Sequence, residues 1–140
     1  MSLEVPTKLE SEINRLVRNY PEKRSASLMV LHALQEEFGY ISPEAEEWAS
    51  ARLDLQPINI HELVTFYPML REHDPGRTVV RVCRTLSCAL AGSHKLHRHI
   101  CDTLGLDANG HGLQRTTDGK FGVEYAECLA SCGTGPVMMC

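Results

Sequence analysis

The 140-residue sequence lacks the features of several large classes of protein. No run approaches the roughly 18 consecutive apolar residues of a membrane-spanning helix, and the N-terminus contains no signal-peptide core. Lysine and arginine number 14 against 18 acidic residues, a formal net charge of -4, which argues against the basic surface of a nucleic-acid-binding protein. We therefore expect a soluble cytoplasmic protein with no membrane span, no nucleic-acid ligand, and other proteins as its partners.

The sequence also lacks the usual signatures of a catalytic site. It has no glycine-rich dinucleotide loop after a strand and no nucleophile beside a general base. A Cys-x-x-Cys pair of the thioredoxin type is missing too. We expect no catalytic residue in this chain.

The first half of the sequence has the periodicity of a helical domain. Apolar residues recur at helical spacing, Gly39 stands where a left-handed C-cap belongs, and Ser42 with Pro43 is typical of an N-cap followed by the first helical residue. Asn59 and Glu62 resemble a capping box. Helices are expected over residues 8–19, 25–38 and 43–53, with a short fourth helix from Asn59 that ends at Pro68.

The pattern changes after residues 71–78, which contain Asp74-Pro75-Gly76 and no apolar periodicity. A β-branched strand over residues 79–82 runs into Cys83, a helix is expected over 93–104, and residues 121–125 alternate as a strand does. We expect an α+β protein, with an N-terminal helical domain over residues 1–76 and an α/β domain over residues 77–140.

Four of the six cysteines form two closely spaced pairs. Four residues separate Cys83 from Cys88, three separate Cys128 from Cys132, and each pair follows an expected strand. If those strands are neighbours in one sheet, both pairs lie at the same edge, where four thiolates can converge. In a reducing compartment such spacing favours metal ligation or redox chemistry over structural disulfides.

Several chemistries fit four converging thiolates. A 2Fe-2S cluster takes two thiolates at each iron, and Gly133 and Gly135 would let backbone N-H groups approach its sulfurs. A structural zinc site, a thiol-disulfide function and a mononuclear iron site remain alternatives. Small hydroxyls are expected close to a cluster, from Thr85, Ser87, Ser131 and Thr134. Apolar side chains are expected to exclude water from it: Leu86, Leu90 and Leu129.

Other polar and aromatic residues receive structural interpretations. Cys101 is expected to be a buried free thiol, and Cys140 lies outside the motif. His94, His97 and His99 are expected on a solvated helix surface rather than at a metal. Helical spacing favours core packing for Trp48 and for the pair Phe66 and Tyr67.

The cysteine segments resemble a known family. Residues 82–88 (VCRTLSC), 117–121 (TDGKF) and 127–137 (ECLASCGTGPV) are similar to the thioredoxin-like 2Fe-2S ferredoxin family represented by the E subunit of NADH-quinone oxidoreductase, respiratory complex I. In the helical half, residues 36–41 (EEFGYI) and 64–67 (VTFY) resemble the same family. The resemblance covers roughly residues 26–139.

The resemblance implies a thioredoxin-like second domain with cluster ligands at Cys83, Cys88, Cys128 and Cys132. It implies a non-catalytic electron-transfer subunit that docks on a flavin-binding subunit, with FMN and NADH on that partner and none on this chain. Related subunits serve NAD-dependent formate dehydrogenases and hydrogenases. The complex would hold the chain at the inner face of the cytoplasmic membrane. Because the family usually continues into a further helix and this sequence ends at Cys140, we expect the last helix to be missing.

Overall fold

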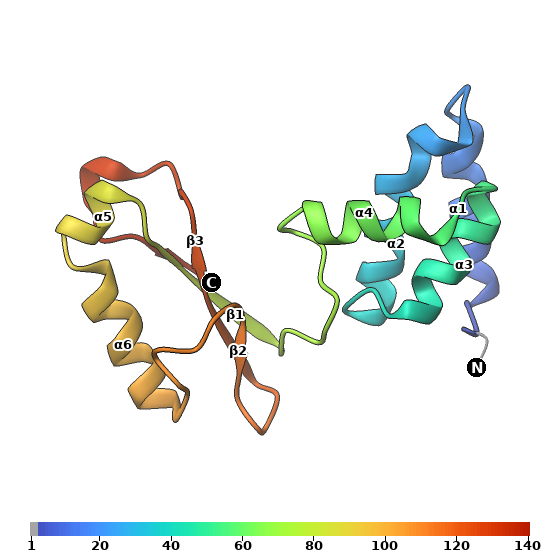
Figure 1. The fold of residues 1–140 in the computed structure, drawn as a ribbon. Coiled ribbons are helices and arrows are strands. Elements are labelled where there is room, and N and C mark those ends of the chain that lie inside the picture. Colours follow the sequence, from blue (N-terminus) through green and yellow to red (C-terminus); the bar gives the residue numbers. More distant parts are fainter. Residues whose placement is uncertain (1–2) are drawn as a thin grey trace. The chain divides into compact units, whose positions relative to one another are not determined.

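The computed structural model describes residues 3–140, which form two compact units, the first ending at Asp74 and the second spanning Pro75–Cys140 (Figure 1). Within these residues the chain has six α-helices and four strands. Four helices come first and a mixed sheet follows, so the expected α+β class is confirmed. In the described part of the chain, no helix is both long and apolar enough to cross a lipid bilayer.

The helical unit begins and ends its helices largely where local sequence signals predict. Gly39 adopts φ 83° and donates its N-H to the carbonyl of Gln35 at 2.8 Å, which closes the second helix. Ser42 Oγ accepts the N-H of Ala45 at 3.3 Å ahead of Pro43. The helices of this unit are α1 (Thr7–Arg18), η1 (Lys23–Ala26), α2 (Ser27–Phe38), α3 (Pro43–Leu53) and α4 (Pro57–Phe66).

The predicted capping box at Asn59 and Glu62 is wrong. Helix α4 begins two residues earlier, at Pro57, and Gln56 occupies the N-cap position without a side-chain cap. The N-H of Asn59 instead donates to the carbonyl of Gln56 at 2.9 Å. A proline at the first helical position has its φ already set and needs no hydrogen-bond partner, so the helix starts there.

The core of the helical unit is built from one face of each helix. Helix α4 contributes Ile60 and Val64, which are four residues apart and fully or nearly buried. Phe66 lies about 200° further round the helix and is 76% exposed, so its predicted core packing is wrong. It contacts half-buried Tyr67 edge to face, with ring centroids 5.1 Å apart. Trp48 is half-buried and packs against the core, as expected.

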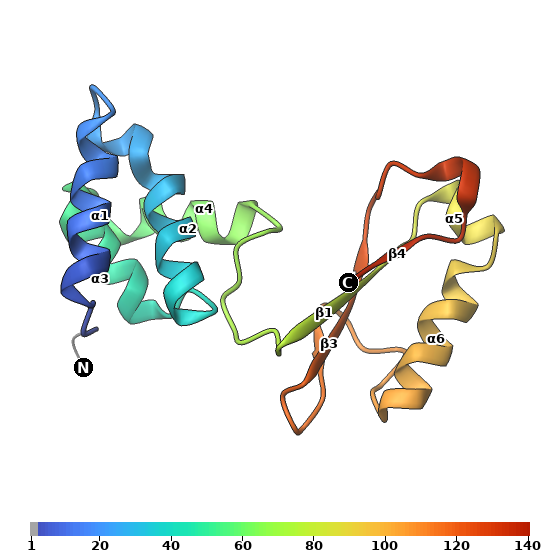
Figure 2. The same ribbon diagram turned by 180° about the vertical axis from the view of Figure 1, so that it is seen from behind.

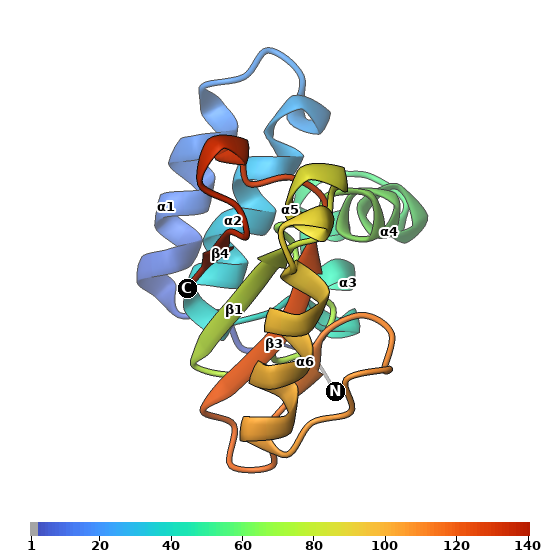
Figure 3. The same cartoon turned by 90° about the vertical axis from the view of Figure 1, so that its left-hand side faces the viewer.

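The second unit is a four-stranded sheet in the order β2-β3-β1-β4. Figure 2 shows the edge strand β4 beside β1. Strand β1 pairs parallel with β3, while β2 and β4 pair antiparallel at the two edges. Helix α6 packs on both central strands and covers one face of the sheet (Figure 3). The elements are β1 (Thr78–Cys83), α5 (Leu86–Leu90), α6 (Ser93–Leu104), β2 (Gln114–Arg115), β3 (Phe121–Ala126), η2 (Cys132–Thr134) and β4 (Met138–Met139).

The parallel pairing of β1 and β3 shows that the strands leading to the two cysteine pairs are neighbours. Their register runs from Thr78 opposite Phe121 to Cys83 opposite Ala126. Both strands therefore end at the same level of the sheet. Helix α6, the connection between them, ends at Gly105 in the left-handed conformation with φ 69°, as its sequence predicts.

Gly122 of β3 gives a test of this arrangement. A Cβ at this position would lie 2.1 Å from the carbonyl oxygen of Pro75, and both atoms belong to the second unit. Gly122→Ala must therefore displace the backbone that leads into β1. We expect a loss of stability of about 1–3 kcal/mol, measured by urea unfolding of the purified protein.

Gly133→Ala is the matched control. A Cβ at Gly133 meets no atom within 4 Å, so this substitution should leave the unfolding midpoint nearly unchanged. Equal stability of the Gly122 variant and the original protein would contradict the close approach of Pro75.

Candidate metal centre

Three chain segments meet where β1 ends. Cys83 is the last residue of β1, and its N-H donates to the carbonyl of Val137 at 3.0 Å. The N-H of Arg84 donates to the carbonyl of Ala126, the last residue of β3, also at 3.0 Å. These bonds bring the loop that contains Cys128 and the segment that precedes β4 to the end of β1.

The second cysteine of the first pair lies on a short helix beside the glycine-rich loop. Cys88 is buried on α5, and a Cβ at Gly135 would lie 3.5 Å from its sulfur. The loop after Cys132 therefore packs directly on Cys88. Among the four cysteines, Cys83 and Cys88 are buried and Cys128 and Cys132 are exposed, and all four are free thiols.

The two buried thiols have different electrostatic environments. A hydrogen bond with the Thr85 hydroxyl, whose oxygen is 3.2 Å from the sulfur, is the main cause that lowers the pKa of Cys83 to about 7. The backbone N-H groups of Thr85 and Leu129 act in the same direction. The pKa of Cys88 is raised, first by its hydrogen bond with Cys83 and then by burial. Cys83 is thus the more acidic of the two buried thiols.

In the second pair, the sulfur of Cys128 accepts a hydrogen bond from the backbone. The N-H of Ala130 donates to the sulfur of Cys128 at 3.3 Å. Ala130 reaches this position with φ 54°, a left-handed conformation that is uncommon for a residue other than glycine. The hydroxyls of Ser131 and Thr134 bond each other at 2.8 Å, whereas the hydroxyl of Thr85 bonds the sulfur of Cys83.

Two of the leucines expected to exclude water do not do so within this chain. Leu86 and Leu90 are 74% and 80% exposed, although both lie on the helix that carries Cys88. They are four residues apart and therefore share a face of that helix. Leu129 is half-buried. Cys88 is two residues from each, about 200° round the helix, so α5 buries Cys88 on one face and exposes an apolar face on the other.

Comparison with known proteins identifies the class to which this arrangement belongs. Residues 13–140 match the family described as thioredoxin-like 2Fe-2S ferredoxin. The chain belongs to this family. The match includes all four paired cysteines and both structural units.

Curated relatives cover most of the chain. The E subunit of NADH-quinone oxidoreductase from Aquifex aeolicus is 32% identical over 97% of this chain and 82% of its own length. NADH-quinone oxidoreductase subunit 2 from Thermus thermophilus is 38% identical over 84% of this chain and 64% of its own length. The NADP-reducing hydrogenase subunit HndA from Solidesulfovibrio fructosivorans is 24% identical over 96% of this chain and 77% of its own length.

The residues present fit the 2Fe-2S cluster for which the family is named. The four sulfurs come as two pairs, and a cluster of this kind takes two thiolates at each iron. Backbone N-H groups face the sulfurs of Cys83 and Cys128, and Gly135 leaves room beside Cys88. In residues 3–140 no three Cys, His, Asp or Glu side chains are gathered as the ligands of a single metal ion.

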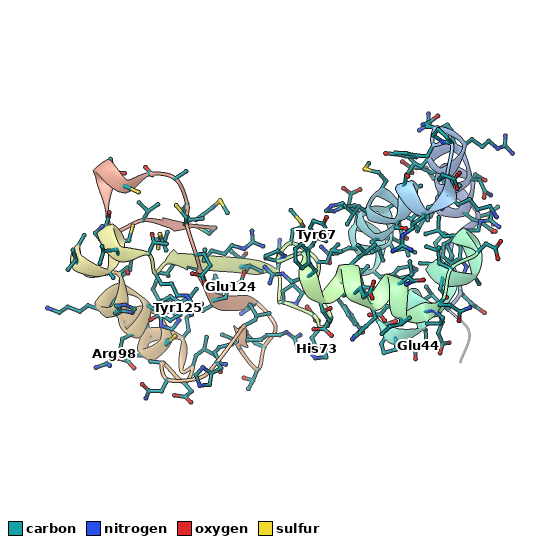
Figure 4. The ribbon with its side chains drawn as sticks, turned by 45° about the horizontal axis from the view of Figure 1, so that its top comes forward. Glu44, Tyr67, His73, Arg98, Glu124 and Tyr125 are labelled. Atoms are coloured by element: carbon teal, nitrogen blue, oxygen red, sulfur yellow. The ribbon has the colours of Figure 1, made fainter. Side chains whose placement is uncertain are left out.

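A buried histidine lies on α6, the helix between the two cysteine pairs in the sequence. His97 is 3% exposed and its ring stacks on Tyr125, with centroids 3.9 Å apart and planes 16° apart. Tyr125 lies alongside α6, whereas Arg98 is on the outer side of that helix (Figure 4). The expectation of a solvated surface is therefore wrong for His97, although His94 and His99 are exposed.

The buried stripe of α6 consists of Ser93, His97 and Cys101, and not of its leucines and isoleucine, which are half-buried. Cys101 is buried and 3.8 Å from either ring nitrogen of His97. Hydropathy does not reveal this stripe, because it ranks leucine and isoleucine above serine and histidine. The spacing of four residues between successive members was the available signal.

The burial of His97 predicts a pH dependence. Burial, and secondarily His94, lowers the pKa of His97 below its usual 6.5. The unfolded chain therefore takes up this proton more readily, so the contribution of His97 to stability is present above pH 6.5 and is lost as the pH falls towards the lowered value. Between about pH 7.5 and 5.5 the original protein should lose more stability than His97→Gln.

Urea unfolding at the two pH values measures this difference. His99→Gln is the control, because His99 is exposed on the same helix. It should show the same pH response as the original protein. If His97→Gln also retains the full pH response, His97 is not the group that responds.

Proposed function

We propose that this chain is the electron-transfer subunit that holds one 2Fe-2S cluster next to the flavin of an NADH dehydrogenase module, as in NADH-quinone oxidoreductase. The observation that carries the proposal is the arrangement of four free thiols at the ends of two neighbouring parallel strands. It is supported by the family match over residues 13–140 and by relatives named as subunits of that oxidoreductase.

The proposed ligands are Cys83, Cys88, Cys128 and Cys132. A bound cluster supplies the chemistry of accepting and releasing one electron. The protein contributes hydrogen bonds to the negatively charged sulfurs from the Thr85 hydroxyl and the Ala130 N-H. Such bonds favour the more negative, reduced form, whereas exclusion of water disfavours it.

The proposed partner is the subunit that binds flavin and NADH. Leu86 and Leu90 form an exposed apolar face on the short helix that carries Cys88, and a docked protein surface would cover it. A donor must also lie close to the cluster for electron tunnelling, and two proposed ligands are already exposed. FMN and NADH would reside on the partner, and the assembled complex would bring this chain to the inner face of the membrane.

An equivalent subunit of a hydrogenase is the second candidate. Its specific support is the 24% identity to the NADP-reducing hydrogenase subunit, over nearly the whole chain. The chemistry at the cysteines would be the same, with a different complex around it. Higher identity to the NADH-quinone oxidoreductase subunits favours the first assignment.

The ligand assignment predicts the outcome of single cysteine substitutions. Protein purified without oxygen should be red-brown and contain nearly equal amounts of iron and acid-labile sulfide, about two of each per chain. Replacing Cys83, Cys88, Cys128 or Cys132 with serine should remove most of both, because a hydroxyl is a poor replacement for a thiolate ligand. Iron, sulfide and zinc analysis measures this.

Cys101→Ser is the control, because Cys101 lies on α6, outside the two pairs, and is buried against His97. It should retain the cluster. Stoichiometric zinc without sulfide in the original protein would select a structural zinc site instead, and equal loss in the Cys101 variant would refute the ligand set.

The proposed partner predicts that NADH oxidation requires both this chain and the flavin subunit. The isolated protein should not oxidise NADH with artificial acceptors, because its sequence contains no dinucleotide-binding loop. Co-expression with a flavin subunit should yield one complex on size-exclusion chromatography, and Leu86→Ser with Leu90→Ser should weaken it while the cluster remains.

Ile58→Ser is the matched control, since Ile58 is 59% exposed but belongs to the helical unit. NADH oxidation by the pure chain would overturn the non-catalytic assignment. Separate elution of the two proteins, with both cofactors intact, would favour an independent ferredoxin.

A further inference from the structure

An ion pair joins the two cysteine loops at residues adjacent to proposed ligands. Arg84 directly follows Cys83, and Glu127 directly precedes Cys128. The Nε atom of Arg84 donates to Glu127 Oε1 at 2.9 Å, and Nη2 donates to the same oxygen. Two donors from one guanidinium thus hold one carboxylate across the gap between the loops.

We propose that Arg84 and Glu127 are positioning residues that hold the two ligand loops together and balance charge beside the cluster. The proposal rests on the ligand assignment made above. Neither side chain is proposed to touch the cluster. Both act through the adjacent cysteines, and each contributes a charge of opposite sign close to the redox centre.

The pair is located where the backbone ladder ends. The parallel register of β1 and β3 stops at Cys83 opposite Ala126, and the N-H of Arg84 makes one further bond to the Ala126 carbonyl. Beyond that point the sulfur of Cys83 lies 3.8 Å from the carbonyl oxygen of Glu127. The ion pair is therefore a side-chain continuation of the strand pairing into the cysteine loops.

The orientation of Arg84 is supported from the sheet. Its guanidinium lies 5.8 Å from the centre of the Tyr125 ring, within cation-π range, and that ring stacks on buried His97. The guanidinium is thus held between an anchored aromatic ring and a carboxylate. This support distinguishes Arg84 from a surface arginine with a freely rotating side chain.

Because the side chains of Arg84 and Glu127 are largely exposed, we expect their ion pair to contribute little to the stability of the fold. The side chains of Arg84 and Glu127 are 50% and 74% exposed, and most exposed ion pairs contribute little to stability. What matters here is the location, because loosening either loop moves a ligand. We therefore expect the effect in cluster retention and potential more than in the unfolding of the whole chain.

The opposite charges of Arg84 and Glu127 predict opposite shifts of the midpoint potential, which a pair with a purely structural role would not produce. Reduction adds an electron to an already anionic site, so the positive Arg84 favours it and the negative Glu127 opposes it. Arg84→Gln should lower the midpoint potential, and Glu127→Gln should raise it. A pair that only held the loops together would shift both variants in the same direction.

The test uses the cluster-containing protein and its variants. Arg84→Gln and Glu127→Gln should each lose iron and sulfide to a chelator about two- to fivefold faster than the original protein. The exchanged pair, Arg84→Glu with Glu127→Arg, should restore much of the retention. Potentials come from a redox titration followed by electron paramagnetic resonance.

Arg81→Gln is the matched control. Arg81 pairs with Glu124 at 2.8 Å, three residues earlier in each segment and within β1 and β3, where the backbone ladder already holds them. It should leave cluster retention unchanged. Retention in Arg84→Gln and Glu127→Gln equal to that in Arg81→Gln, or potential shifts of the same sign, would overturn the proposal.

A different result would refute the ligand assignment itself. If serine variants of the paired cysteines keep their iron and sulfide, the ligands lie elsewhere, whatever the ion pair does. If those variants lose the cluster but the ion-pair variants do not differ from the control, the ligand set stands and the positioning role is refuted.

Discussion

The parallel pairing of β1 with β3 is the constraint on which the site depends. Its register places Cys83 opposite Ala126, so the loops after both strands leave the sheet at one edge. A shift of one residue would turn every side chain of one strand to the other face of the sheet. Helix α6 supplies the long connection that a parallel pair requires, and Gly122 permits the close approach of Pro75 beside β3.

Elements with strong local signals could be predicted from the sequence, whereas the pairing of the two strands was only a condition, which the structure meets. Gly39, Ser42 and Gly105 each perform a capping role that follows from their own chemistry. The start of α4 could not be fixed in this way, because Asn59 and Pro57 offered competing starts within one turn. The exposure of Phe66 depends on which face of α4 packs on the other helices, and hydropathy alone does not determine that face.

The buried stripe of α6 shows why hydropathy does not predict which side chains of the second unit are buried. Burying a histidine is unfavourable for its charged form, but stacking on Tyr125 and contact with Cys101 make the neutral ring an acceptable core residue. The leucines and isoleucine of α6 take the flanking, half-buried positions instead. The stacking of His97 on Tyr125 can be recognised only once Tyr125 is placed on the face of the sheet that α6 covers, which is a property of the tertiary structure.

The site itself divides between parts that the sheet fixes and parts that it does not. Cys83 is held by the end of the ladder and Cys88 by packing against Gly135, so both sulfurs are buried. Cys128 and Cys132 are exposed, beyond the last residue of β3. In that loop the strained backbone of Ala130 aims an N-H at Cys128, and the Ser131 hydroxyl bonds that of Thr134. Local hydrogen bonds therefore replace the ladder where it ends, and strain of this kind persists only where surrounding contacts over-determine the backbone.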